Sequence, residues 1–170
     1  MSAAFRLRFP VGEIGHWSAR FQDDDEPVER LVPKVKGRGF LTKAEFLVVC
    51  RWKTARSQSR CRENSEEFVR AVTACSLGSN DERLRIEVLT LLSGVSWPTA
   101  SVILHFFHSA AYPILDFRAL WSLQCDVPAQ YDFQFWWDYT RFCCDLSRRT
   151  GESMRTIDRA LWQFSKENQP

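Results

Sequence analysis

The stretch "LLSGVSWPTASVILHFFHSAAYPILDFRAL", Leu91 to Leu120, decides the fold. A helix ends shortly before Gly94, and an apolar helix begins after Ser96. Pro98 is compatible with this start, because the amide that proline lacks has no partner in the first turn of a helix. The stretch therefore predicts two helices joined by a tight glycine turn, followed by a single carboxylate, Asp116.

The turn of this hairpin is a candidate binding site for phosphate. Backbone N–H groups at a helix start point outward with the positive end of the helix dipole behind them, and Gly94 allows another backbone to approach closely. The candidate contacts are Gly94, Val95, Ser96, Trp97 and Thr99. A glycine turn between helices is also a common structural connector, so the hairpin alone leaves both interpretations open.

Asp116 lies between the apolar "YPIL" and the helical "FRALWSL". An aspartate that caps a helix start contributes about 1 kcal/mol of stability, which is a sufficient reason for its presence. A carboxylate fixed at a helix start also suits electrostatic catalysis, and the two roles are compatible.

The rest of the chain is patterned for helices. "LTKAEFLVVCRWKTA" opens with Thr42 and Glu45 in capping-box spacing, and "NSEEFVRAVTACSLG" ends at a glycine. "SNDERLRIEVLTLLSG" repeats this design with Ser79 as the expected cap, and two further helices follow in "YDFQFWWDYTRFCCDLSRRTG" and "SMRTIDRALWQFSKEN". Strand-like alternation is confined to Phe5 to Phe9, so the predicted class is all-α.

Length and composition predict one compact multi-helix domain over residues 1–170, since 45% of the 170 residues are hydrophobic. Lys and Arg number 23 against 21 Asp and Glu, a net charge of +2, so any surface for nucleic acid must be a local patch. The sequence has no apolar run of membrane-spanning length and no signal peptide, and we expect a cytoplasmic monomer that does not bind membranes. The six cysteines lack CxxC spacing and fit buried, reduced thiols better than disulfides or a zinc site.

The hairpin and the aspartate resemble a known family. "LSGVSWPTASVIL" followed by "YPILDFRAL" looks like the hairpin and catalytic-aspartate segment of the helix-hairpin-helix DNA glycosylases, the endonuclease III superfamily, with its pattern L-P-G-V-G-x-x-T-A and a later V-D pair. "CRWKTARSQSR" stands where the family has a segment that reaches into DNA near the flipped base. "RTIDRALWQF" is similar to the closing helix of some relatives.

The sequence also departs from that family. Bifunctional members carry a Schiff-base lysine just before the T-A pair, where this chain has Pro98. Ser96 replaces the second glycine of the hairpin, and the four-cysteine iron–sulfur loop is missing. The resemblance therefore implies a monofunctional enzyme without a cofactor, in which Asp116 stabilises the cationic sugar and water breaks the N-glycosidic bond of a flipped base in double-stranded DNA.

Other residues are weaker candidates. Lys53, Arg56 and Arg60 belong to the densest basic cluster and are expected to contact the DNA backbone, although a solvated helix end explains Lys53 equally well. Trp52 and His105 are candidates for the base pocket or the wedge, and both also fit ordinary packing.

Three classes of function stay open at this point. One is a DNA glycosylase that acts on a damaged or modified base, including hypermodified phage DNA. The second is a non-catalytic helix-hairpin-helix module that binds DNA by shape and phosphate. The third is an all-α interaction module unrelated to DNA.

Overall fold

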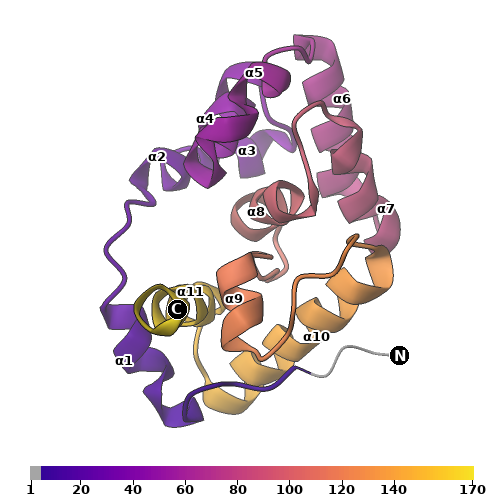
Figure 1. The fold of residues 1–170 in the computed structure, drawn as a ribbon. Helices are drawn as coiled ribbons and strands as arrows, with labels where there is room; N and C mark the ends of the chain where they lie inside the picture. Colours follow the sequence, from indigo (N-terminus) through magenta and orange to yellow (C-terminus); the bar gives the residue numbers. More distant parts are fainter. Residues whose placement is uncertain (1–4) are drawn as a thin grey trace. The chain divides into compact units, whose positions relative to one another are not determined.

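The computed structural model describes residues 5–170, and within them every regular element is a helix (Figure 1). The prediction of an all-α protein is confirmed. The described residues fall into two compact units. The central unit is Asp24–Ala110, and the terminal unit combines the chain up to Asp23 with Ala111–Pro170. Whether the two act as one domain, as the sequence predicts, stays a prediction.

The central unit is built around the second helix of the hairpin, α8 (Trp97–Phe107). Eight of its side chains are buried, as expected for a helix that is apolar nearly all round. It packs against α3, α4 and α7. The elements before it are α2 (Glu26–Glu29), α3 (Val32–Arg38), α4 (Lys43–Lys53), η2 (Ala55–Ser57), α5 (Gln58–Cys61), α6 (Glu66–Gly78), α7 (Glu82–Glu87) and η3 (Val88–Leu91).

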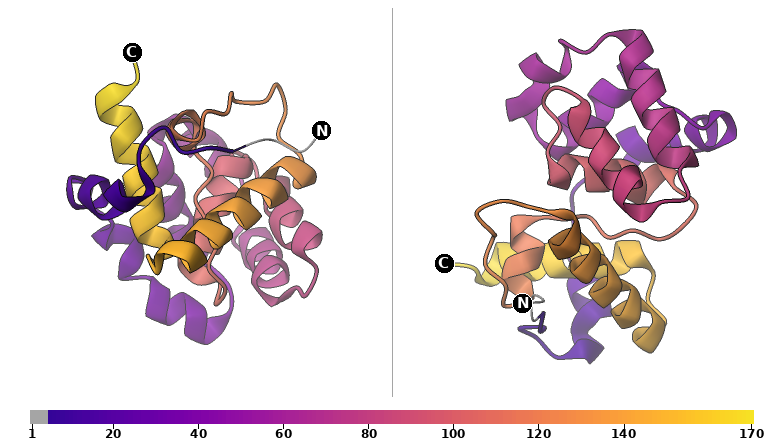
Figure 2. Two further views of the ribbon diagram at one scale, coloured as in Figure 1. Left: turned by 90° about the horizontal axis from the view of Figure 1, so that it is seen from below. Right: turned by 90° about the vertical axis from the view of Figure 1, so that its right-hand side faces the viewer.

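In the terminal unit the closing helix α11 (Met154–Asn168) has the equivalent role, because it packs against α1, α9 and α10 (Figure 2). The other elements are η1 (Val11–Glu13), α1 (Ile14–Ala19), α9 (Phe117–Ser122) and α10 (Phe133–Thr150). Trp136 and Tyr139 of α10 are the largest fully buried side chains. The first and last parts of the chain therefore share one core with the segment that carries Asp116.

The alternation at Phe5 to Phe9 does not form a strand. The amides of Arg6 and Arg8 instead donate to the carbonyls of Leu123 and Ser122, each at 2.9 Å. Those carbonyls lie at the end of α9, where a helix leaves its last acceptors without internal partners. Two backbone hydrogen bonds thus connect the start of the described chain to the end of α9.

Of the predicted caps, Thr42 and Asp116 accept a helix-start amide, whereas Ser96 begins α8 without such a bond and Ser79 begins no helix. Thr42 and Glu45 form the predicted capping box, and Ser65 caps α6. The expected cap Ser79 is wrong, because Asp81 accepts the Leu84 amide at 2.7 Å and begins α7. The Ser79 hydroxyl accepts from the Asp81 amide and so forms the turn before the helix.

None of the helices described in residues 5–170 is both long enough and apolar enough to cross a bilayer.

The expected burial of the cysteines is only partly correct. Cys50, Cys61 and Cys143 are buried, whereas Cys75 is exposed and the other two are half-buried. Within residues 5–170, no group of three or more His, Cys, Asp or Glu side chains is placed to hold a metal ion.

Candidate nucleic-acid interface and active site

The hairpin turn depends on glycine at position 94. Gly94 has a φ of 81°, a left-handed conformation that residues with a Cβ rarely adopt. A Cβ built there would lie 2.7 Å from the Cys61 sulfur and 2.9 Å from the Cys61 amide nitrogen. The backbone of α5 therefore lies directly against the turn, and the approach of a phosphate to Gly94 stays a prediction.

A buried asparagine holds the same turn from the other side. The Asn64 side chain accepts from the Ser93 amide at 2.9 Å and donates to the Ser93 carbonyl at 3.0 Å. It also donates to the Cys61 carbonyl, at 2.9 Å. Asn64 is 5% exposed, and its bond to the Cys61 carbonyl is buried, whereas the two bonds to Ser93 are partly buried. The turn is thus fixed to the connection between α5 and α6, and no local sequence pattern indicates this contact.

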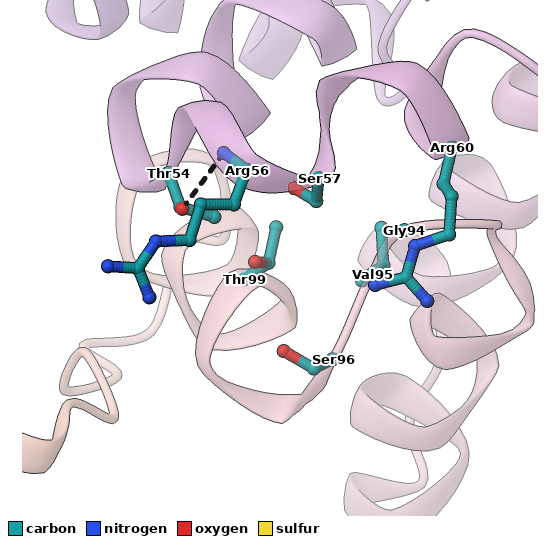
Figure 3. A pocket seen from close by; sticks show the side chains of 8 residues that line it. All are labelled: Thr54, Arg56, Ser57, Arg60, Gly94, Val95, Ser96 and Thr99. Atoms are coloured by element: carbon teal, nitrogen blue, oxygen red, sulfur yellow. Dashed lines mark hydrogen bonds between the residues drawn. The ribbon is translucent and has the colours of Figure 1, made fainter.

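A cavity of about 310 Å³ opens between the hairpin and the segment after α4. Hydroxyls of Thr54, Ser57, Ser96 and Thr99 line it, with Arg56 at one end and Arg60 at the other (Figure 3). Gly94 and Val95 complete its wall. The cavity thus combines hydroxyl donors with two guanidinium groups, which is a donor set suited to an oxyanion such as a phosphodiester.

The backbone amides of the turn differ in their availability. The Val95 amide donates to the Leu92 carbonyl at 3.1 Å, so it is used within the turn. Ser96 is the N-cap of α8 and makes no side-chain cap hydrogen bond. Its hydroxyl and the first amides of the eleven-residue helix α8 therefore form the part of the hairpin best suited to an external anion.

The pocket gathers six of the predicted contact residues and leaves the others outside. Those inside are Arg56, Arg60, Gly94, Val95, Ser96 and Thr99. Lys53 is the last residue of α4 and Trp97 the first of α8. Neither lines the cavity.

Of the two candidates for the base pocket or wedge, Trp52 belongs to α4 and packs against α8, whereas His105 is a residue of α8 itself. Trp52 donates its indole N–H to the Asp24 carbonyl at 3.0 Å, and its ring meets Phe106 edge-on at 5.4 Å. His105 also meets Phe106 edge-on, at 4.9 Å. These contacts describe ordinary packing within the central unit, and a contact of either residue with a base stays a prediction.

Asp116 belongs to the terminal unit, where it is the N-cap of α9. Its carboxylate accepts from the Arg118 amide at 2.9 Å, as an N-cap aspartate is expected to do. The side chain is half-buried, and the next residue, Phe117, is 51% exposed. The carboxylate is thus fixed at a half-buried helix start, one residue before an exposed aromatic side chain.

A chain of contacts between cations and aromatic rings begins at Phe117 and Arg118 of this helix. The guanidinium of Arg118 lies 5.1 Å from the ring centre of Phe117 and 5.5 Å from that of Trp162. Lys166 approaches Trp162 at 4.7 Å, and Trp162 meets Phe21 edge-on at 5.4 Å. We call the following residues the cation–aromatic cluster: Phe21, Phe117, Arg118, Arg155, Arg159, Trp162 and Lys166. Basic side chains interleaved with rings suit a nucleic acid, and no sequence pattern predicted this cluster, because its residues are far apart in the chain.

Two tyrosines lie near Asp116. Burial, followed by the charge of Asp116, raises the pKa of Tyr131. Burial is also the main cause that raises the pKa of Tyr139 well above its ordinary value, with smaller contributions from Cys143, Asp158 and Asp116. Tyr139 therefore keeps its phenolic proton through the neutral range and remains a hydrogen-bond donor.

The sequence matches no family model. It also matches no curated protein. Among solved structures, the 8-oxoguanine glycosylase/lyase of Methanocaldococcus jannaschii, in complex with a 15mer DNA containing 8-oxoguanine, is similar to it. The similarity has a TM-score of 0.53 over 93% of this chain and 81% of that chain, at 13% identity. At this identity the likeness concerns the fold, and the chain therefore has the fold of a DNA glycosylase.

Proposed function

We propose that this protein is a monofunctional DNA glycosylase, which flips a damaged or modified base out of double-stranded DNA and hydrolyses its N-glycosidic bond. The observation that carries the proposal is the half-buried carboxylate of Asp116, fixed by the Arg118 amide in a chain with the fold of a DNA glycosylase. The cap role is compatible with catalysis, because a carboxylate held by the Arg118 amide has a fixed position and can stabilise a developing positive charge.

In this reaction the bond between C1′ and the base breaks with its electron pair moving to the base, and the sugar becomes cationic. Asp116 stabilises the developing positive charge and orients the attacking water. Water gives its hydroxyl to C1′ and a proton to the departing base. The products are a free base and an abasic site.

The surroundings of Asp116 support contact with nucleic acid. The cation–aromatic cluster brings positive charge and stacking surfaces to the helix start that carries Asp116. Its arginines and lysine suit phosphate oxygens, and its rings suit a base removed from the helical stack. Aromatic side chains on a base are worth about 1–3 kcal/mol for each base stacked.

The central unit supplies the second contact in the proposal. The pocket between Arg56, Arg60 and the hairpin holds a backbone phosphate, which positions DNA without reading its sequence. Lys53, at the end of α4, adds a further cation to this side.

8-oxoguanine is the first substrate to test, because the similar structure is a glycosylase/lyase bound to DNA that contains this base. Alkylated, deaminated and hypermodified phage bases complete the panel. Excision of a base from any of these DNAs supports the proposal. Excision from none of them, by a protein that still binds DNA, favours the alternative of a non-catalytic helix-hairpin-helix module.

The role of Asp116 is tested by Asp116→Asn, which keeps the cap acceptor for the Arg118 amide and removes the charge. We expect single-turnover excision to slow by about 10²-fold or more while the affinity for DNA is retained, since only the transition state loses stabilisation. Asp126→Asn is the matched control, because Asp126 is an exposed aspartate of the same unit. Full activity in Asp116→Asn would rule out this mechanism.

The proposal also predicts hydrolysis without strand cleavage. Pro98 stands where bifunctional relatives carry the Schiff-base lysine, so water is the nucleophile. Borohydride added during turnover should therefore trap no protein–DNA cross-link, and the strand should stay intact until heated or treated with alkali. A cross-link that disappears in Lys53→Ala would move the nucleophile to the end of α4.

A further inference from the structure

Two buried side chains form hydrogen bonds with the backbone of Ile114, which lies two residues before Asp116. The Ile114 amide donates to Asp158 Oδ1 at 3.1 Å, and the Ile114 carbonyl accepts from the Tyr139 hydroxyl at 2.8 Å. Asp158 comes from α11 and Tyr139 from α10. The backbone N–H and the backbone carbonyl of one loop residue are therefore both held by helices distant in the sequence.

This arrangement is costly, because Asp158 is 4% exposed and Tyr139 is fully buried. Burial of a carboxylate or a hydroxyl is unfavourable unless hydrogen bonds replace those lost to water. Apolar side chains of similar size often stabilise a core as well as buried polar groups do. A buried carboxylate on α11 is better explained by the defined geometry that it gives to the loop than by a gain in stability.

The hydrogen bonds to Ile114 also restrict the position of Asp116, because only one residue separates the two. Leu115 has no exposed surface and separates Ile114 from Asp116. On the other side, Asp116 accepts from the Arg118 amide at the start of α9. The backbone is thus held two residues before the carboxylate and two residues after it, which leaves little freedom for the carboxylate between them.

We propose that Asp158 and Tyr139 are positioning residues, which set the location of the Asp116 carboxylate through the Ile114 backbone. The inference rests on the proposed function, since it assigns to these two residues a part in the reaction of Asp116. It goes further by assigning a role to the core of the terminal unit. A shift of about 1 Å in a catalytic group costs up to about 10²-fold in rate, so the effect is measurable.

The test compares variants that remove a hydrogen bond to the Ile114 backbone with a variant that keeps an acceptor there. Asp158→Ala removes the acceptor for the Ile114 amide, whereas Asp158→Asn keeps an oxygen there and loses the charge. Tyr139→Phe removes only the donor to the Ile114 carbonyl. Gln163→Ala is the matched control, because Gln163 is a buried polar residue of α11 that bonds to Glu167.

Three quantities are measured on the full chain: the single-turnover excision rate, the dissociation constant for substrate DNA, and hydrogen exchange at the Arg118 amide. The last reports the contact with Asp116 directly and needs no activity. We expect Asp158→Ala and Tyr139→Phe to slow excision about 10-fold or more at unchanged DNA affinity, with faster exchange at Arg118. Asp158→Asn should restore most of the rate, and Gln163→Ala should alter none of the three.

The idea is overturned if Asp158→Ala and Tyr139→Phe leave both the excision rate and the Arg118 exchange as in the wild type. An equal loss in Gln163→Ala would also overturn it, by showing a general effect of core damage. If Asp158→Ala does not fold, Tyr139→Phe decides, because it removes only the donor to the Ile114 carbonyl. If the wild type excises no base, the proposed function fails, and the Arg118 exchange still shows whether Asp158 and Tyr139 fix Asp116.

Discussion

At the scale of single residues, Gly94 separates two roles that the sequence pattern could not distinguish. Its positive φ and its contact with the Cys61 backbone are needed to form the turn at all. A β-branched residue at 94 would disrupt the turn and would reveal nothing about phosphate. The arginines of the pocket are the better probes, because their exposed side chains can be removed without touching the turn.

We predict that the double variant Arg56→Ala with Arg60→Ala binds all DNA sequences more weakly. The salt dependence of binding should also flatten, by about one to two in the slope of log K against log salt, since two phosphate contacts are lost. Arg83→Ala is the control, because Arg83 is an exposed arginine of the central unit that pairs with Glu87 on α7. An unchanged slope in the double variant would show that the pocket binds no phosphate.

At the scale of elements, the connection between α5 and α6 and the hairpin stabilise each other through Asn64. One side chain satisfies both polar groups of Ser93 and the carbonyl of Cys61. A buried amide or carbonyl left without a partner costs about 1–3 kcal/mol. The hairpin should therefore loosen locally when this side chain is removed.

We predict that Asn64→Ala lowers the free energy of unfolding by about 1–3 kcal/mol and speeds hydrogen exchange at the Ser93 amide. Urea unfolding and exchange measured by NMR test both effects. Asn80→Ala, at an exposed asparagine in the turn before α7, should leave both quantities unchanged. An Asn64→Ala protein with wild-type stability and a protected Ser93 amide would contradict the proposed stabilisation of the hairpin by Asn64.

The same elements explain what the sequence could predict. The caps at Thr42 and Asp116 are local, since the partners lie within three residues, and a local pattern found them. Arg56 and Arg60 were found because basic residues gather in one short segment. Asn64 and Asp158 bond to residues 29 and 44 positions away, and no local pattern carries that information.

At the scale of the molecule, each unit contains buried thiol or phenol groups whose pKa is raised, so that they stay protonated. Burial raises the pKa of Cys50 in the central unit. Burial also raises the pKa of Cys143 and of Tyr139 in the terminal unit. In the unfolded chain these groups would lose their protons at their ordinary values, about 8.5 for cysteine and about 10 for tyrosine.

The sign of the pH effect follows from this difference. Above about pH 9 the unfolded chain binds fewer protons than the folded protein, so the free energy of unfolding falls as the pH rises. Each group that is ionised in the unfolded chain and protonated in the folded protein lowers the free energy of unfolding by about 1.4 kcal/mol per pH unit. This applies between its pKa in the unfolded chain and its pKa in the folded protein. Stability should therefore be level near neutrality and should decline steeply between about pH 9 and pH 11.

The decline can be assigned to particular groups by urea unfolding across this range. Tyr139→Phe removes one proton that the fold retains, so above about pH 10 its stability should fall less steeply than that of the wild type by about 1.4 kcal/mol per pH unit. Cys75→Ser serves as the control, because Cys75 is exposed and its replacement leaves the buried protons unchanged. A slope in Tyr139→Phe equal to that of the wild type would mean that Tyr139 ionises within the fold. In that case the hydroxyl would no longer donate to Ile114 at high pH, and excision should fall over the same range.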